Sequence, residues 1–256
     1  MKIRRKFPKP SAARPLYAIG YTFPAPPTDV LQRRYDREYG GPLQFTREPS
    51  KPQIAREGET FRVTHGPWHV HIRITLSAEE SNEWKERLVW NHSRIGLVTT
   101  GSLTPANAAD TILLAARLAR EFTLLTDGTA YDVAAQAYLN PSDWKDLDLT
   151  SFHCDHHVRV VQAEGMRPEF DWFHTLGLSK FGLDEIELLQ PLGLPDAPVT
   201  ELLRELANEL IRRGRSPKVG EVIECPFLSC AVRVVRHRTA SPGGTLLILR
   251  EIQPLL

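Results

Sequence analysis

Four side chains on two segments expected to be strands are the residues best suited to metal chemistry. Alternate side chains of an extended chain share a face, so His69 pairs with His71 and Asp155 pairs with His157. Imidazole nitrogen and carboxylate oxygen are ligands that zinc takes in tetrahedral geometry. If the two strands pair, these residues form a zinc site. Because bound zinc lowers the pKa of water, a metal-dependent hydrolase becomes the alternative function.

Two observations weigh against that site. Arg73 and Arg159 fall on the same strand faces, where their guanidinium groups disfavour a dication. The chain also contains 9 histidines, so some clustering is expected. We therefore favour a solvated sheet face for these residues and predict no cofactor, with zinc as the alternative.

The most distinctive segment of the chain is a glycine-bounded turn near residues 174–187. Its candidate site residues are His174, Gly177, Lys180, Gly182 and Glu185. In a functional interpretation, His174, Lys180 and Glu185 line a cleft as acid, electrostatic anchor and base. In a structural one, the glycines permit a turn that the phenylalanines and leucines pack onto the core. We favour the structural interpretation, because the segment is rich in core-type residues and lacks a nucleophile.

The cysteines give no support to an enzyme. Cys154 stands between His153 and Asp155, but strand neighbours point to opposite faces and cannot form a catalytic relay. Cys225 and Cys230 have no second cysteine pair, so a zinc ribbon is not indicated. No nucleotide-binding loop or nucleophile elbow occurs either, and the sequence favours a non-enzymatic protein.

Hydrophobic periodicity and capping residues predict the elements that position these side chains. Strands are expected at 16–23, 59–76, 95–100, 152–163, 219–224, 230–236 and 245–251. The alanine-rich segment 129–139 is ambiguous between helix and strand, and we favour a short strand there. Helices are expected at 28–39 after Thr28, at 78–90 after Ser77, at 105–121 after Thr104, at the turn 141–147, and between Thr200 and Gly214. This order predicts an α+β fold, with a mixed or mainly antiparallel sheet and helices packed on one face.

Composition limits the classes of partner. The formal charge of +1, from 32 basic and 31 acidic side chains, does not support binding to nucleic acid. No apolar run reaches the roughly 20 residues that span a bilayer, and 3 cysteines suit a reducing compartment, so we expect a cytoplasmic protein. Residues 1–15 are expected to form a basic tail that can be disordered. Residues 16–256 are expected to form one domain, with a division near 145–152 left open.

The turn also carries a family resemblance. Thr175-Leu176-Gly177-Leu178, Lys180-Phe181-Gly182 and Glu185 resemble the C-terminal signature of the bacterial DUF4261 domain, with Asp171-Trp172-Phe173 before them. The resemblance implies no activity and no catalytic residue. It implies an intracellular bacterial protein, of a kind often proposed to bind partners, including toxins for which it is the antidote. We therefore expect a non-enzymatic protein that binds a protein partner.

Overall fold

The computed structural model describes residues 15–49, 58–74, 88, 92–101, 103–164, 168–241 and 245–255. The basic tail, except for its last residue, and the predicted helix 78–90, except for Leu88, lie outside the described residues. Among the helices of the described part, none is long and apolar enough to cross a membrane.

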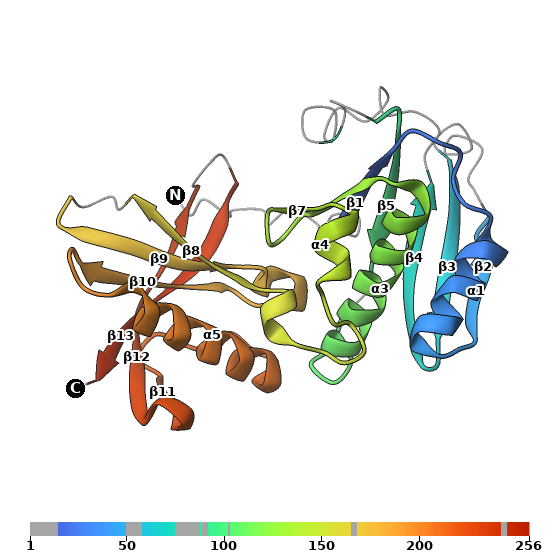
Figure 1. Cartoon of the computed structure of the whole chain (residues 1–256). Coiled ribbons are helices and arrows are strands. Elements are labelled where there is room, and N and C mark those ends of the chain that lie inside the picture. Colours follow the sequence, from blue (N-terminus) through green and yellow to red (C-terminus); the bar gives the residue numbers. More distant parts are fainter. Residues whose placement is uncertain are drawn as a thin grey trace, which may run out of the picture.

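The strands form two sheets rather than one (Figure 1). The first sheet has the order β2-β3-β4-β5-β1-β6-β7 and the second the order β11-β12-β13-β10-β9-β8. The strands of the first sheet are β1 (Pro15–Tyr21), β2 (Leu43–Arg47), β3 (Glu59–His65), β4 (Trp68–Ile74), β5 (Arg94–Thr99), β6 (Thr129–Asp132) and β7 (Ala137–Leu139). Those of the second are β8 (Arg159–Glu164), β9 (Phe170–Leu176), β10 (Glu185–Pro191), β11 (Val222–Cys225), β12 (Cys230–Ala240) and β13 (Leu247–Leu255).

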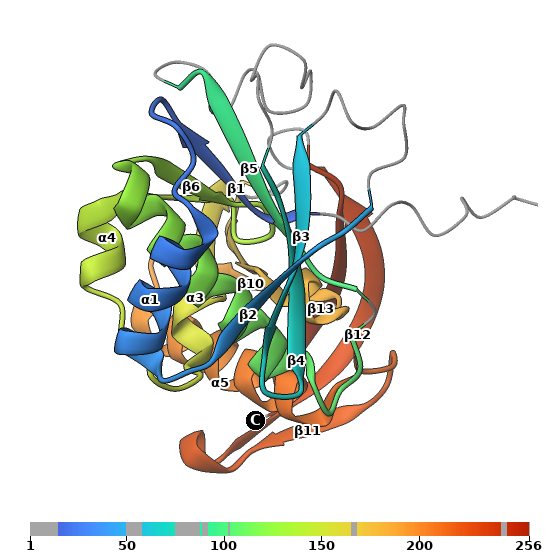
Figure 2. The same ribbon diagram turned by 90° about the vertical axis from the view of Figure 1, so that its right-hand side faces the viewer.

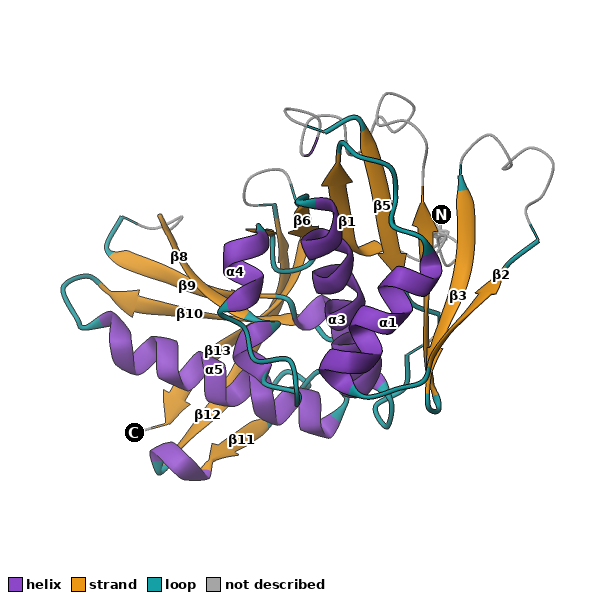
Figure 3. Ribbon diagram, turned by 45° about the vertical axis from the view of Figure 1, so that its right-hand side comes forward, coloured by secondary structure: helices purple, strands orange, loops and turns teal. Residues whose placement is uncertain are grey.

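Neighbouring strands run antiparallel everywhere except at β10 and β13, which are parallel. Helices α1 (Thr28–Tyr39), α3 (Ala108–Thr126) and α4 (Pro141–Lys145) cover one face of the first sheet, and α5 (Asp196–Arg213) lies along one face of the second (Figures 2 and 3). The predicted α+β class with a mainly antiparallel arrangement is therefore confirmed.

Helix starts differ from the sequence-based expectations. Helix 28–39 is confirmed, but Pro27 rather than Thr28 occupies its N-cap. Helix α3 begins at Ala108, because residues 104–107 form a turn in which Asn107 Oδ1 accepts a hydrogen bond from Thr104 N at 2.7 Å. Helix α5 begins at Asp196, before Thr200, and Gly214 ends it as expected, with φ of 64°.

Two predicted strands are broken by turns. The region 59–76 contains the hairpin β3–β4, which reverses at Gly66 with φ of 57°. The first part of segment 152–163 folds into the short 3₁₀ helix η1 (Cys154–His156), so the strand begins only at Arg159. The prediction that Asp155 and His157 share a strand face is therefore wrong.

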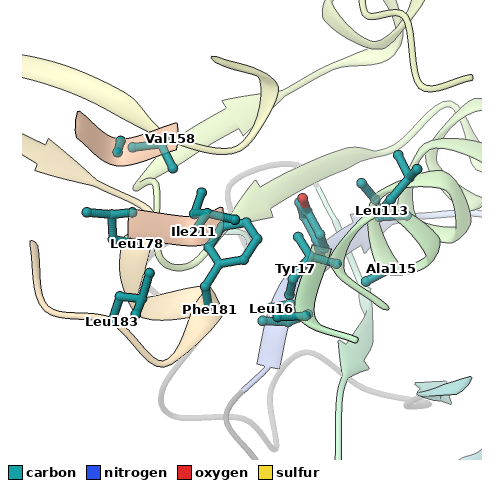
Figure 4. Packing of buried hydrophobic residues seen from close by; sticks show 14 of the residues in the cluster. Leu16, Tyr17, Leu113, Ala115, Val158, Leu178, Phe181, Leu183 and Ile211 are labelled. Atoms are coloured by element: carbon teal, nitrogen blue, oxygen red, sulfur yellow. The ribbon is translucent and has the colours of Figure 1, made fainter. Parts of the chain in front are cut away.

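The two sheets meet across shared hydrophobic packing. Tyr17 of β1 and Leu113 of α3 belong to the same buried cluster as Phe181 and Ile211 from the second half of the chain (Figure 4). The chain leaves the first sheet at Leu139 and enters the second at Arg159. Segments from both halves therefore pack together around Tyr17, Leu113, Phe181 and Ile211, a region called the junction below.

Candidate functional site

The glycine-bounded turn at the junction is organised around a buried carboxylate. Glu185 accepts hydrogen bonds from the backbone N–H groups of Gly177 at 3.0 Å and Ser179 at 3.0 Å, and from the Thr175 hydroxyl at 2.8 Å. The Leu178 N–H donates to it at 3.2 Å. The three N–H groups lie at the start of the 3₁₀ helix η2 (Leu178–Phe181), where amides lack partners inside the helix. The carboxylate thus caps the turn, which supports the structural interpretation of the motif.

Burial raises the pKa of Glu185, and the hydrogen bonds to the carboxylate oppose that rise. The expected role of Glu185 as a base is not supported, since both of its oxygens already accept hydrogen bonds from the turn.

Gly177 lets the turn approach the segment that carries His157. Its φ is 126°, and a Cβ atom built there would lie 2.3 Å from the His157 carbonyl oxygen. No side chain fits that space. Gly182 ends η2 with φ of 74°, but no atom stands within 4 Å of a Cβ at that position. Glycine is therefore needed at position 177 because the His157 backbone lies too close for a side chain. At position 182 it is needed only because the backbone has a positive φ.

Lys180 of η2 connects the second half of the chain to the first sheet. Its ammonium group donates a hydrogen bond to Asp132 at the end of β6, and both side chains are buried. Tyr17 completes the group, with the Lys180 nitrogen 5.6 Å from its ring centroid. Burial, followed by the Asp132 charge, raises the pKa of Tyr17 well above 10, so the phenol stays protonated. The junction thus contains a compensated ion pair beside a neutral phenol.

His157 stands beside this pair with unused hydrogen-bonding capacity. Its side chain is 1% exposed, and neither ring nitrogen has a hydrogen-bond partner among the described residues. The ring stacks on Phe152 with a centroid distance of 5.0 Å and an interplanar angle of 7°. Burial lowers the pKa of His157 well below 6.5, and the charge of Lys180 acts in the same direction. The neutral imidazole therefore offers one N–H donor and one nitrogen acceptor at pH 7.

A cavity of about 560 Å³ opens next to His157. The residues with ionisable side chains that line it are Asp132, Tyr138, Asp143, Asp146, Asp155, His156, His157 and Arg159. Asp132 is neutralised by Lys180, and the Arg159 guanidinium donates to the carbonyl oxygens of Ala135 and Gln136. Three further carboxylates leave the mouth of the cavity acidic.

Those three carboxylates have different constraints. Asp143 accepts a hydrogen bond from the Asn140 N–H at 2.8 Å and so completes the capping box of α4. Asp155 lies 4.0 Å from Arg204, and both side chains are more than half exposed, so water screens their attraction. Asp146 is exposed. Asp146 and Asp155 are therefore open to an incoming cation.

The structure does not assemble the predicted acid, anchor and base. His174 stacks on Trp172 with ring centroids 4.3 Å apart, and nearby Arg238 helps burial to lower its pKa to about 4. Lys180 instead pairs with Asp132, and Glu185 caps η2. Lys180 and Glu185 both line a cavity of about 240 Å³, but His174 does not, so the three side chains share no cleft.

The predicted metal set is also divided. His69 and His71 lie on β4 in the first sheet, which pairs with β3 and β5 rather than with the Asp155 and His157 segment. His71 Nδ1 is 3.1 Å from Glu48 Oε1. Within the described ranges, no group of three or more histidine, cysteine, aspartate or glutamate side chains could hold a metal ion. The expected pairing of the two histidine segments is wrong, because turns place them in different parts of the fold.

Sequence reasoning missed Tyr17, Asp132, Asp143 and Asp146. Asp132 had one signal, since it is an acidic residue directly after the apolar run Ala130-Tyr131 in a predicted strand. Residues from both predicted sets meet at the junction. His157 and Asp155 come from the predicted metal ligands and Lys180 comes from the glycine-bounded turn, whereas Asp132, the partner of Lys180, belonged to neither set.

Comparison of this chain with known protein families, sequences and structures identifies no similar protein. No protein-family model matches this chain, and neither the curated proteins nor the solved structures yield a match. The resemblance of the turn to the DUF4261 signature therefore stays an expectation.

Proposed function

We propose that this chain is a non-enzymatic binding protein that takes a lysine or arginine side chain of a protein partner into the junction cavity. The observation that carries the proposal is that the buried residue His157 lines an acidic cavity, while neither nitrogen of its imidazole has a hydrogen-bond partner among the described side chains and backbone.

A basic side chain complements this chemistry. A buried polar group without a partner costs roughly 1–3 kcal/mol, so a ligand that supplies the missing hydrogen bond gains that energy. Ammonium and guanidinium groups carry only donors, and neutral His157 presents one acceptor. Asp146 and Asp155 at the mouth attract the positive charge. The same carboxylates repel phosphate groups.

The edge of the cavity favours a protein partner over a free amine. Tyr138 is 54% exposed there and packs against Tyr131 with ring centroids 4.8 Å apart. A tyrosine held by its neighbour offers contact area at little entropic cost, which is why tyrosine is enriched at interfaces. A toxin neutralised by this chain is one partner of this kind, and the expected setting is the bacterial cytoplasm.

The reactive groups nearest the cavity support binding rather than catalysis. Burial raises the pKa of the Cys154 thiol to about 12, which leaves little thiolate for nucleophilic attack near neutral pH. Glu185 is engaged by the turn, and Lys180 is engaged by Asp132.

The proposal is tested by titrating the protein with N-acetyl-arginine amide while its amide and imidazole NMR signals are followed. The matched probe is N-acetyl-citrulline amide, which has a similar shape without the charge. We expect saturable shifts at His157 and Asp146 with the arginine probe only. Replacing Asp146→Asn and Asp155→Asn together should weaken binding about fivefold, since exposed ion pairs contribute up to about 1 kcal/mol.

The control variant removes the same charge elsewhere. Glu201→Gln with Glu224→Gln changes two exposed carboxylates on α5 and β11, outside the cavity, and should leave binding unchanged. Equal responses to both probes, or no saturable response at concentrations that detect a millimolar dissociation constant, would refute the proposal.

A further inference from the structure

Two cysteines face each other across the hairpin β11–β12. Cys225 is the last residue of β11, Cys230 is the first of β12, and the antiparallel register places them directly opposite. Directly opposed residues have Cα atoms about 4.5–5.5 Å apart, inside the roughly 4.4–6.8 Å range of disulfides. Directly opposed side chains lie on the same face of the hairpin, so the two thiols are neighbours. The backbone spacing therefore permits a disulfide between these two residues.

The two cysteines are joined by a short loop and differ in their exposure to solvent. The residues between the two strands form the 3₁₀ helix η3 (Pro226–Leu228) and Ser229, whose φ is 49°. Cys225 is 1% exposed, whereas Cys230 is partly exposed beside the hairpin tip. Phe227 at that tip is 87% exposed. A small oxidant in solvent can therefore reach Cys230 but not Cys225.

We propose that Cys225 and Cys230 form a thiol–disulfide exchange site that is oxidised by a low-molecular-weight disulfide such as oxidised glutathione. The Cys230 thiolate attacks one sulfur of that disulfide, forms a mixed disulfide and expels one glutathione thiolate. The Cys225 sulfur then attacks Cys230 Sγ and expels the second. The two protons lost by the cysteine thiols go to the two glutathione thiolates, and the two electrons of the new bond reduce the oxidant.

The order of attack follows from the surroundings of each thiol. Burial raises the pKa of Cys225 to about 12, and the neighbouring Cys230 acts in the same direction. Cys225 therefore reacts poorly with an external oxidant but stands next to Cys230 once the mixed disulfide exists. Cys154 lies on η1 outside this hairpin and has no opposed cysteine in the strand register.

The experiment exposes the reduced native protein to oxidised glutathione, quenches with acid, unfolds the chain and alkylates the remaining thiols. Intact mass then gives the number of alkylated cysteines. We expect this number to fall from 3 to one, with the loss of two hydrogen atoms confined to a single tryptic peptide that contains both residues, since no lysine or arginine separates them. A far-ultraviolet circular dichroism spectrum should show that the oxidised chain stays folded.

Single variants separate this site from adventitious oxidation. Cys154→Ser should still form the bond. Cys225→Ser should stop at a glutathione adduct on Cys230, and Cys230→Ser should react far more slowly than the wild type. If the native wild type keeps all its thiols while the urea-unfolded chain is oxidised, or if the bond involves Cys154, the proposal is overturned.

Discussion

Lys180 donates a hydrogen bond to Asp132 across the junction, and both side chains are buried although 48 positions separate them in the chain. Lys180 lies on η2 in the glycine-bounded turn, and Asp132 ends a strand of the first sheet. The turn is thereby connected to the other half of the molecule. The Lys180–Asp132 pair is therefore one of the contacts that join the two halves.

The first prediction concerns this ion pair. Replacing Lys180→Met should lower the free energy of unfolding by about 3–5 kcal/mol, because it leaves Asp132 as a buried charge without compensation. Urea denaturation followed by circular dichroism measures the change. Adding Asp132→Asn removes the second charge but keeps an acceptor for the Ala135 N–H, so the double variant should regain more than half of the loss. A single variant as stable as the wild type would contradict the burial of the pair.

The second prediction compares the two glycines of the turn. Gly177→Ala should cost at least about 3 kcal/mol, since the added Cβ meets the His157 carbonyl oxygen and the φ of 126° is strained for alanine. Gly182→Ala should cost only about 1 kcal/mol, because its positive φ is unfavourable but the space is open. Thermal unfolding of both variants gives the order. Equal costs would show that the approach of η1 to the turn is not as tight as described.

The third prediction concerns the carboxylate that caps η2. Glu185→Gln replaces an acceptor of four hydrogen bonds with a group whose amide nitrogen can only donate, and we expect a loss of about 2 kcal/mol or more. Glu224→Gln, which changes an exposed carboxylate on β11, is the control and should alter stability by less than about 0.5 kcal/mol. Hydrogen exchange at Gly177 and Ser179 should accelerate in Glu185→Gln alone.

The fourth prediction is a pH dependence at His174. Its pKa is about 4 in the folded chain, against 6.5 for an ordinary histidine. Between these values the unfolded chain binds more protons, so stability is complete above pH 6.5 and falls as the pH decreases towards 4. At pH 5 this one group should cost about 2 kcal/mol.

His174→Phe keeps an aromatic ring against Trp172 and removes the titration. The difference in unfolding free energy between the wild type and this variant should therefore change by that amount between pH 7.5 and pH 5. His157 also has a lowered pKa and remains in both proteins, so it cancels in the comparison. A difference that does not vary with pH would mean that His174 is solvated in the folded protein.

Local signals placed several elements correctly from the sequence. Helix 28–39 follows from the prolines before Thr28 and the glycines at 40 and 41, and Gly214 ends α5 because glycine takes a positive φ at low cost. The two predicted C-terminal strands pair with each other as β12 and β13. Element starts were less certain where a competing local hydrogen bond exists. Asn107 shows this, since its contact with Thr104 delays the start of α3.

The candidate site was less accessible to sequence reasoning, because its residues come together only through long-range packing. Lys180 and His157 were singled out for their chemistry, but the partners assigned to them were wrong. Lys180 was grouped with His174 by proximity in sequence, and His157 was grouped with His69 by residue type. The true partner of Lys180 is Asp132, in a segment where strand and helix were hard to distinguish.

The sequence alone determined the α+β class, most of the helices and strands, and the glycine-bounded turn at Gly177 and Gly182, because these depend on periodicity, capping and backbone conformation over a few residues. The capping of that turn by buried Glu185 was seen only in the structure. Only the tertiary structure decided that the strands divide into two sheets and that Asp132 meets Lys180 beside an unpaired His157. The physical reason is that the burial of a charge or an imidazole depends on which distant segments exclude water from it, and short-range patterns do not contain that information.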